Sequence, residues 1–109
     1  MRVKSGVDLI AEERQRQVQV EGYTSAHDSI HKDGELFLAA TSYLDAPDVI
    51  GVPLQWPWDL EFYKPTPNDR VRELVKAAAL LAAEIDRLRL LANETNSSIS
   101  AHLINEASK

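Results

Sequence analysis

Hydrophobic positions recur at helical spacing in three segments of the chain. The first segment lies between Ser5, which can cap the start of a helix, and Gly22, which can end one. The second covers roughly Gly34 to Leu44, with Asp33 as a suitable N-cap. The third begins after Asn68, another residue that favours the N-cap position. This pattern predicts an all-α protein.

The third segment carries the most regular pattern. Its hydrophobic residues alternate steps of three and four, which predicts a heptad seam. The seam residues are Val71, Leu74, Ala78, Leu81, Ile85, Leu88 and Ala92. Val75, Ala79 and Ala82 widen the stripe, so we expect this helix to be buried on more than one side, and its alanines permit close packing. The Val71–Ala92 segment is also where we expect the chain to pair with a second copy.

Residues 45–68 interrupt the helical pattern. They contain all five prolines and four of the seven aromatic residues, in a connection long enough to be functional or folded onto the core. Pro57 separates Trp56 from Trp58, and extended geometry there would turn the two rings to opposite sides. We therefore expect one tryptophan to face the core and the other to be available to a ligand.

The predicted architecture is a single helical domain over residues 1–109. It consists of a small bundle of three main helices and a short C-terminal helix, with the Pro/aromatic loop of residues 45–68 packed on it. Residues 97–109 are expected to form that short helix or to remain a frayed tail, with Ser97 or Ser98 as the cap. No internal repeat or low-complexity segment interrupts this organisation.

Composition narrows the classes of function. A chain of 109 residues is near the size at which burial by a partner often helps a domain fold. Its net charge of −5 provides no general basic field, so nonspecific nucleic-acid binding is disfavoured. The absence of cysteine excludes disulfides and thiolate zinc sites, and no apolar run predicts a signal peptide or a membrane span. We expect a soluble cytosolic protein.

Two histidines and a carboxylate form a candidate metal site. His27, His31 and Glu35 are spaced by four residues and would share one face if the second helix began early. Imidazole and carboxylate groups at this spacing can bind a divalent transition metal. If the helix instead starts at Asp33–Gly34, both histidines lie in the preceding loop and can hydrogen-bond its backbone. Both alternatives remain open.

Clustered carboxylates suggest a second chemistry. The chain has a superficial similarity to the all-α nucleoside triphosphate pyrophosphohydrolases of the MazG type, which hold Mg²⁺ with acidic pairs on two helices. Glu12, Glu13 and Glu35 would be the ligands here. However, the positions after Glu13 hold arginine and glutamine where a further carboxylate is expected. The sequence also contains no glycine-rich phosphate loop and no serine nucleophile motif, so we expect no catalytic residue.

Arginine and glutamine gather on the first predicted helix, in the string ERQRQ. Arginine can hold phosphate through two hydrogen bonds, and neighbouring aromatic rings could stack on a base, so the two features together would form a nucleotide pocket. The candidate ligand-binding residues are Arg14, Arg16, Tyr23, His27, His31, Trp56, Trp58, Tyr63, Lys64 and Arg70. Lys76 interrupts the apolar run between Val75 and Ala77. Its ammonium group either reaches solvent or pairs with a buried acid or a ligand phosphate.

Several motifs together resemble those of small proteins encoded by tailed bacteriophages and prophages. They are ERQRQ, EG followed by an aromatic residue and Thr, HD with a later His, GEL, WPWD, and a helix running from LVKA to AEIDRL, over roughly residues 10–88. Tyr23 and Tyr63 stand where we expect tryptophan. The resemblance implies a phage or prophage origin and action in the cytoplasm of a bacterial host, without implying a reaction.

A second resemblance is to the ryanodine-receptor repeat domain. Arg14 or Arg16, the Gly22–Thr24 segment, His31 and the Asp69–Arg70 pair echo the order of its motifs. Bacterial and phage versions of that domain are suspected of binding nucleotide-derived ligands. The resemblance therefore implies a binding module rather than an enzyme.

Three hypotheses about function follow from the sequence. The first is a non-catalytic module that binds a nucleotide-derived small molecule, such as a host defence signal, with no cofactor. The second is a Mg²⁺-dependent nucleoside triphosphate pyrophosphohydrolase. The third is an interaction protein that modulates a host protein through its aromatic loop, because Trp, Tyr and Arg dominate interface hot spots.

Overall fold

The computed structural model describes residues 3–45 and 55–107, with side chains described for residues 3–44 and 55–93. The described residues are mostly helical and contain no strand, which confirms the predicted helical class. The elements are α1 (Gly6–Gln19), α2 (Ser25–Ser29), α3 (Glu35–Asp45), the short 3₁₀ helix η1 (Leu60–Phe62) and α4 (Arg70–Ala107). No helix in this part of the chain is long and apolar enough to cross a membrane.

Local capping explains where α1 begins. The Ser5 hydroxyl accepts a hydrogen bond from the Asp8 backbone N–H, and the Asp8 carboxylate accepts one from the Ser5 N–H, both at 3.1 Å. This reciprocal pair is a capping box, and it confirms Ser5 as the N-cap. Beyond the end of α1, Gly22 has a φ of +78°, a left-handed conformation that glycine adopts without steric cost.

The segment between Gly22 and Gly34 contains a short helix that the sequence pattern did not resolve. Thr24 caps α2 by accepting a hydrogen bond from the His27 backbone N–H at 3.3 Å. His27 therefore lies within α2, while His31 lies beyond its end. Gly34 has a φ of +83° and precedes α3, so a helix start close to the predicted Asp33–Gly34 position is observed.

Two predictions about α4 were wrong. The Asp69 carboxylate, rather than Asn68, accepts the Arg72 backbone N–H at 3.0 Å, whereas Asn68 adopts a left-handed conformation with a φ of 74°. The expected separate helix at 97–109 does not form, because α4 continues without a break to Ala107. The sequence of α4 contains neither glycine nor proline, and a run of polar residues alone lowers helix propensity too little to end a helix.

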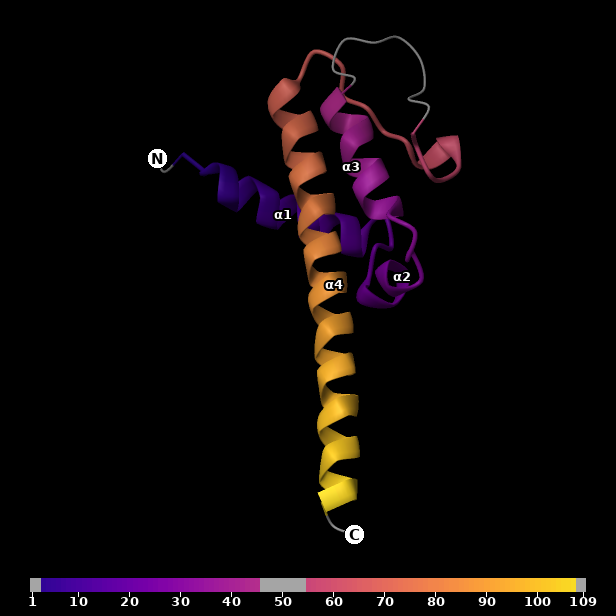
Figure 1. Cartoon of the computed structure of the whole chain (residues 1–109). Coiled ribbons are helices and arrows are strands. Elements are labelled where there is room, and N and C mark those ends of the chain that lie inside the picture. The colour runs from indigo at the N-terminus through magenta and orange to yellow at the C-terminus, as the bar shows by residue number, and fades with distance from the viewer. Residues whose placement is uncertain (1–2, 46–54, 108–109) are drawn as a thin grey trace.

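Figure 1 shows α3 lying alongside the first part of α4, with α1 crossing behind α4 and α2 near the start of α3. The last turns of α4 extend beyond the other helices. The core is centred between α3 and α4, where alanines on both helices allow a close approach. Its buried residues are Tyr23, Leu36, Ala39, Ala40, Tyr43, Trp56, Ala77, Leu80 and Ala83.

The face of α4 that packs on the core is not the one that the heptad pattern predicts. Five of the seven seam residues are exposed: Val71 (62%), Leu74 (42%), Ile85 (56%), Leu88 (50%) and Ala92. The buried face instead includes the charged residues Glu73 and Lys76. Hydrophobic periodicity missed this face because it treats any charged residue as a solvent position, whereas here the charges are paired with one another.

The described part of the aromatic loop folds back on the helices, as predicted. Trp56 is 9% exposed and belongs to the core, while Trp58 and Tyr63 are partly buried against it. Residues 46–54 of the predicted loop lie outside the described residues. The loop residues from 55 onward therefore contribute side chains both to the core and to the surface beside it.

Candidate functional site

A groove of about 520 Å³ lies between α2 and the loop segment around Trp58. Rings make up most of its wall, and we call it the aromatic groove. The residues that line it are Glu21, Tyr23, His27, His31, Pro57, Trp58, Asp59 and Phe62. The structure thus brings together four of the candidate residues named from the sequence. It adds Phe62 and Pro57, which belong to the aromatic loop, and the two acids.

The rings of the groove pack against one another. Tyr23 stacks on His27 with centroids 4.8 Å apart and planes 20° apart. Trp58 lies 5.3 Å from Tyr23 and 5.2 Å from His31, and the two histidine rings are 4.4 Å apart. Ring pairs at these separations attract each other beyond simple burial of area. The wall of the groove is therefore held in place by contacts between its own side chains.

The two tryptophans contact each other rather than pointing to opposite sides: Trp56 is buried in the core, and Trp58 packs partly against that core while also lining the groove. The Trp56 ring packs edge-on against Tyr43 at 5.7 Å and lies 5.0 Å from Tyr63, and its Nε1–H donates to the Asp59 carbonyl at 3.1 Å. Trp58 lies perpendicular to Trp56 at 5.5 Å and lines the groove. Trp56 and Tyr63, both candidates from the sequence, therefore lie on the core side.

A chain of hydrogen bonds orients the groove histidines. The Trp58 Nε1 lies 3.5 Å from His31 Nδ1, the two histidine Nε2 atoms are 3.1 Å apart, and His27 Nδ1 lies 2.9 Å from Asp28 Oδ1. An indole N–H can only donate and a carboxylate can only accept. When both histidines are neutral, one arrangement of protons satisfies every contact: His31 carries its proton on Nε2 and donates it to His27, which donates from Nδ1 to Asp28.

Arg14 anchors this chain to α1. Its guanidinium donates to Asp28 Oδ2 at 2.9 Å and to the Tyr23 carbonyl at 3.0 Å. Asp28 is only 2% exposed, and a buried carboxylate is stable when charged donors surround it. At the other end of the chain, burial lowers the pKa of His31, the neighbouring His27 lowers it further, and Glu35 and Asp28 oppose these effects. Arg14 therefore has a positioning role in the free protein.

The remaining candidate cations also have acceptors within the chain. Arg16 and Lys64 both donate to Glu21, at 3.1 and 2.7 Å, and Arg70 donates to the Tyr43 carbonyl at 3.3 Å. Burial alone would raise the pKa of Glu21, but its hydrogen bonds with Lys64 and Arg16 lower it overall. None of these cations lines the aromatic groove. Their expected role in binding phosphate remains a prediction.

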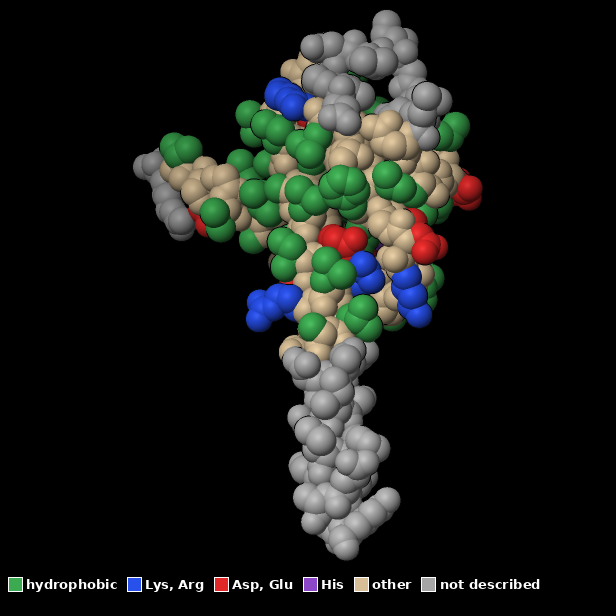
Figure 2. Space-filling view, in the orientation of Figure 1, with side chains coloured by type: hydrophobic (Ala, Val, Ile, Leu, Met, Phe, Trp, Pro, Cys, Tyr) green, Lys and Arg blue, Asp and Glu red, His purple; other side chains and the backbone are tan. Residues whose placement is uncertain are grey.

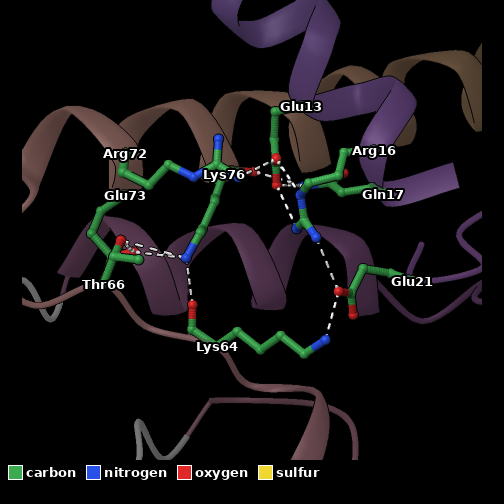
Figure 3. A network of polar contacts seen from close by, with 9 residues as sticks. All are labelled: Glu13, Arg16, Gln17, Glu21, Lys64, Thr66, Arg72, Glu73 and Lys76. Carbon is green, nitrogen blue, oxygen red and sulfur yellow. Dashed lines mark hydrogen bonds and ion pairs between the residues drawn. The ribbon is translucent and has the colours of Figure 1, made fainter. Parts of the chain in front are cut away.

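Beside the groove lies a buried network of charged and polar residues (Figure 3). At its centre is Glu13, whose side chain is 0% exposed. Its carboxylate accepts two hydrogen bonds from Arg16, at 2.7 and 2.9 Å, and one from Arg72 at 2.6 Å. Burial alone would raise the pKa of Glu13, but the hydrogen bonds and charges of the two arginines outweigh it and lower the pKa.

Lys76 forms the second part of this network. It is 5% exposed, and its ammonium group donates to the Lys64 carbonyl and lies 3.8 Å from Glu73 Oε2, which also accepts the Thr66 hydroxyl at 3.0 Å. Burial lowers the pKa of Lys76, and Glu73 opposes that change. Of the alternatives raised by the sequence, Lys76 therefore pairs with a buried acid rather than reaching solvent. Its position within the apolar run, between Val75 and Ala77, was the feature of the sequence that indicated burial.

A small cavity of about 20 Å³ separates the network from the core rings. The Gln17 side chain reaches it, and its Oε1 atom is buried without a hydrogen-bond partner from the chain. A cavity of this size can hold one water molecule. The network meets the aromatic groove at Glu21, whose carboxylate pairs with Arg16 and Lys64 and also lines the groove.

The carboxylates named as possible metal ligands do not converge. Glu12 is exposed and pairs with Lys4 at 2.8 Å, Glu13 is enclosed by arginines, and Glu35 accepts the backbone N–H of Asp33 at 3.0 Å. Among the described residues, no three His, Asp or Glu side chains are placed to hold one metal ion. Neither the histidine site with Glu35 nor the predicted Mg²⁺ site is assembled in this fold.

Comparison with protein-family models, with curated proteins and with solved structures finds no match to this chain. The resemblance to phage and prophage proteins remains a prediction from sequence motifs. The function is therefore best argued from the geometry of the aromatic groove.

Proposed function

We propose that the protein is a non-catalytic binding module for a nucleotide-derived small molecule, whose base stacks in the aromatic groove. The observation that carries this proposal is the wall of flat rings, in which Tyr23, His27, His31, Trp58 and Phe62 line one open space. Stacking of a base on an aromatic side chain contributes about 1–3 kcal/mol and tolerates different bases. The groove volume of about 520 Å³ lies within the usual range for small-molecule sites.

The charges around the groove support a base rather than a phosphate as the buried part of the ligand. Its charged lining consists of Glu21 and Asp59, which would repel phosphate but could accept hydrogen bonds from ring N–H or amino groups. Lys64 pairs with Glu21 and its side chain is 54% exposed, so its ammonium group could meet a phosphate outside the groove. The ligand would therefore enter base first.

The free protein already holds these rings in place. Trp58 contacts Tyr23 and His31, and the histidine chain is anchored on Asp28 and Arg14. A preformed wall loses little side-chain entropy when a ligand binds, which improves affinity. Together with the motif resemblances, this arrangement supports a role in sequestering a nucleotide-derived signal in the cytoplasm of a bacterial host.

The test is calorimetry with the four common nucleosides and their triphosphates, each with and without Mg²⁺. We expect at least one nucleoside to bind without Mg²⁺, and Trp58→Ala to weaken that binding more than tenfold, in line with the loss of one stacking contact. Phe37→Ala is the matched control, since Phe37 is an exposed aromatic residue on α3 (52%) and does not line the groove. Circular dichroism would establish that both variants are folded.

The outcomes distinguish the three hypotheses. Binding that survives Trp58→Ala, or no binding of any base, would overturn the proposal. Turnover of a triphosphate only when Mg²⁺ is present would instead favour the pyrophosphohydrolase. Loss of a host-protein contact on Trp58→Ala, with no nucleoside binding, would favour the interaction protein.

A further inference from the structure

The charged groups that line the aromatic groove are both acids. They are Glu21 and Asp59, and no described lysine or arginine lines the groove beside them. Glu21 is already compensated within the chain, because it pairs with Arg16 at 3.1 Å and with Lys64 at 2.7 Å and its side chain is only 5% exposed. The charge that remains for a ligand is therefore that of Asp59.

Asp59 holds its carboxylate open beside the wall of rings. It is exposed and occupies the N-cap position of η1, yet its side chain makes no capping hydrogen bond. Among the side chains that the structure describes, none pairs with this carboxylate. Figure 2 shows one face of this region: the described surface around η1 carries acidic and hydrophobic side chains, and the lysines and arginines in view lie over α2 and α4. The charge of Asp59 is thus left uncompensated at the groove.

The groove histidines do not offset this negative charge. Their contacts run from Trp58 through His31 and His27 to Asp28, and the neutral rings supply one proton for each contact. One more proton on the two rings would bring two N–H groups face to face in one of these contacts. Burial also lowers the pKa of His31. The hydrogen-bond chain therefore favours an uncharged pair, and the lining of the groove is negative.

An aromatic wall beside an open carboxylate is complementary to a flat cation. The faces of Trp and Tyr rings attract cations, and the attraction grows as the cation loses water. Trp58 and Tyr23 provide such rings, 5.3 Å apart, on the wall of the groove. A neutral base gains only stacking from these rings, whereas a positively charged base also gains the attraction of the ring faces and of the carboxylate.

We propose that the aromatic groove selects a cationic base, one with an alkylated ring nitrogen, and that Asp59 supplies the opposite charge. This inference rests on the proposed function, because it names the class of nucleotide-derived ligand that the same groove takes. Tyr23 and Trp58 stack on the base, and the open carboxylate distinguishes the charged base from a neutral one of the same size. A phosphate on the ligand would remain outside, where Lys64 is exposed.

Calorimetry of the full chain at neutral pH with N1-methyladenosine and N6-methyladenosine tests the preference for charge. The two nucleosides are isomers, and only the N1-methylated one carries a positive charge at neutral pH. We expect N1-methyladenosine to bind roughly tenfold tighter, in line with a cation held over aromatic rings at a partly desolvated site.

Asp59→Asn separates the charge from the stacking. Asparagine keeps the size of the side chain and removes its charge, so this variant should bind the two isomers with similar affinity. Its affinity for N6-methyladenosine should equal that of the natural chain, which would also establish that the groove is intact. Glu61→Gln is the matched control: Glu61 is exposed and lies in η1 but does not line the groove, so this variant should keep the preference for N1-methyladenosine.

The outcomes separate this inference from the proposed function. Equal affinity of the natural chain for the two isomers would overturn the selection of a cation and leave base binding in place. A preference that survives Asp59→Asn would overturn the role of this carboxylate. Binding of neither isomer, nor of any common nucleoside, would overturn the proposed function and this inference with it.

Discussion

Replacing Glu13 by glutamine should destabilise the protein far more than the same change one residue earlier. Glu13→Gln preserves the shape of the side chain but removes the negative charge that Arg16 and Arg72 share. Breaking a buried ion pair by removing one partner typically costs about 3–5 kcal/mol, because the other charge is left uncompensated. Here the two arginine side chains are 34% and 35% exposed, so they can regain water. We therefore expect a loss of about 2–3 kcal/mol.

Urea unfolding at neutral pH, followed by circular dichroism, measures this loss. A domain of this size has a total stability of about 5–15 kcal/mol, so the midpoint should fall clearly while the denaturant slope stays the same. Glu12→Gln is the control: Glu12 is 54% exposed and pairs with Lys4, which is 59% exposed. Removing this surface pair should leave the midpoint nearly unchanged, because ion pairs between exposed side chains contribute little to stability.

The pH dependence gives an independent check of the same carboxylate. The pKa of Glu13 is lowered in the folded state from its ordinary value of 4.5, because the arginines outweigh the effect of burial. The stability that this ionised group contributes is therefore present above about pH 4.5 and lost as the pH falls through the folded-state pKa. Glu13→Gln should flatten the acid limb of the stability curve. Equal losses for Glu13→Gln and Glu12→Gln would refute the reasoning.

Two further predictions concern the groove histidines and the start of α3. The folded-state pKa of His31 lies below its ordinary value of 6.5, so the unfolded chain binds a proton first and stability should fall as the pH drops below about 6.5. His31→Gln should reduce that slope in urea midpoints taken between pH 8 and pH 5, and an unchanged slope would contradict the assignment. Gly34 has a φ of +83°, and a methyl group on its Cα would meet no atom within 4 Å, so Gly34→Ala should cost about 1–2 kcal/mol from backbone strain alone. In thermal unfolding, the melting temperature of Gly34→Asn should lie between those of the natural chain and Gly34→Ala, since asparagine tolerates this conformation better than alanine. Equal melting temperatures for all three proteins would exclude the strain.

Local signals in the sequence predicted the outline of the fold. Ser5 and Asp8 lie three residues apart, and a capping box needs only that spacing, so the start of α1 could be predicted. The burial of Trp56 in the core agrees with the expectation that one tryptophan faces inward, but the two rings contact each other instead of pointing to opposite sides, so the alternation drawn from Pro57 did not describe Trp58. The position of α2 was less accessible, because five residues are too few to show a helical period.

The candidate site was predictable in its aromatic part and not in its charged part. Tyr23, His27, His31 and Trp58 do meet in one groove. The sequence predicts Arg14 to bind phosphate because arginine often does so. In the fold, the Arg14 guanidinium donates instead to Asp28 and to the Tyr23 carbonyl. Whether an arginine is available to a ligand depends on carboxylates brought near by packing, which a linear pattern does not encode.

By itself, the sequence determined the helical class, the segments that become α1, α3 and α4, and the aromatic character of the groove, because these depend on propensity, capping and spacing along a few turns. Only the tertiary structure decided which side of α4 is buried. Glu73 and Lys76 can face the interior because each finds an opposite charge or a hydrogen-bond partner there. The same face of α4 also meets α1, where Arg72 donates to Glu13 and the Lys76 carbonyl accepts from Gln17, each pair 59 residues apart in the chain. Contacts between residues so far apart are not encoded in a local hydrophobic pattern, so only the packing of the helices decided which side of α4 faces inward.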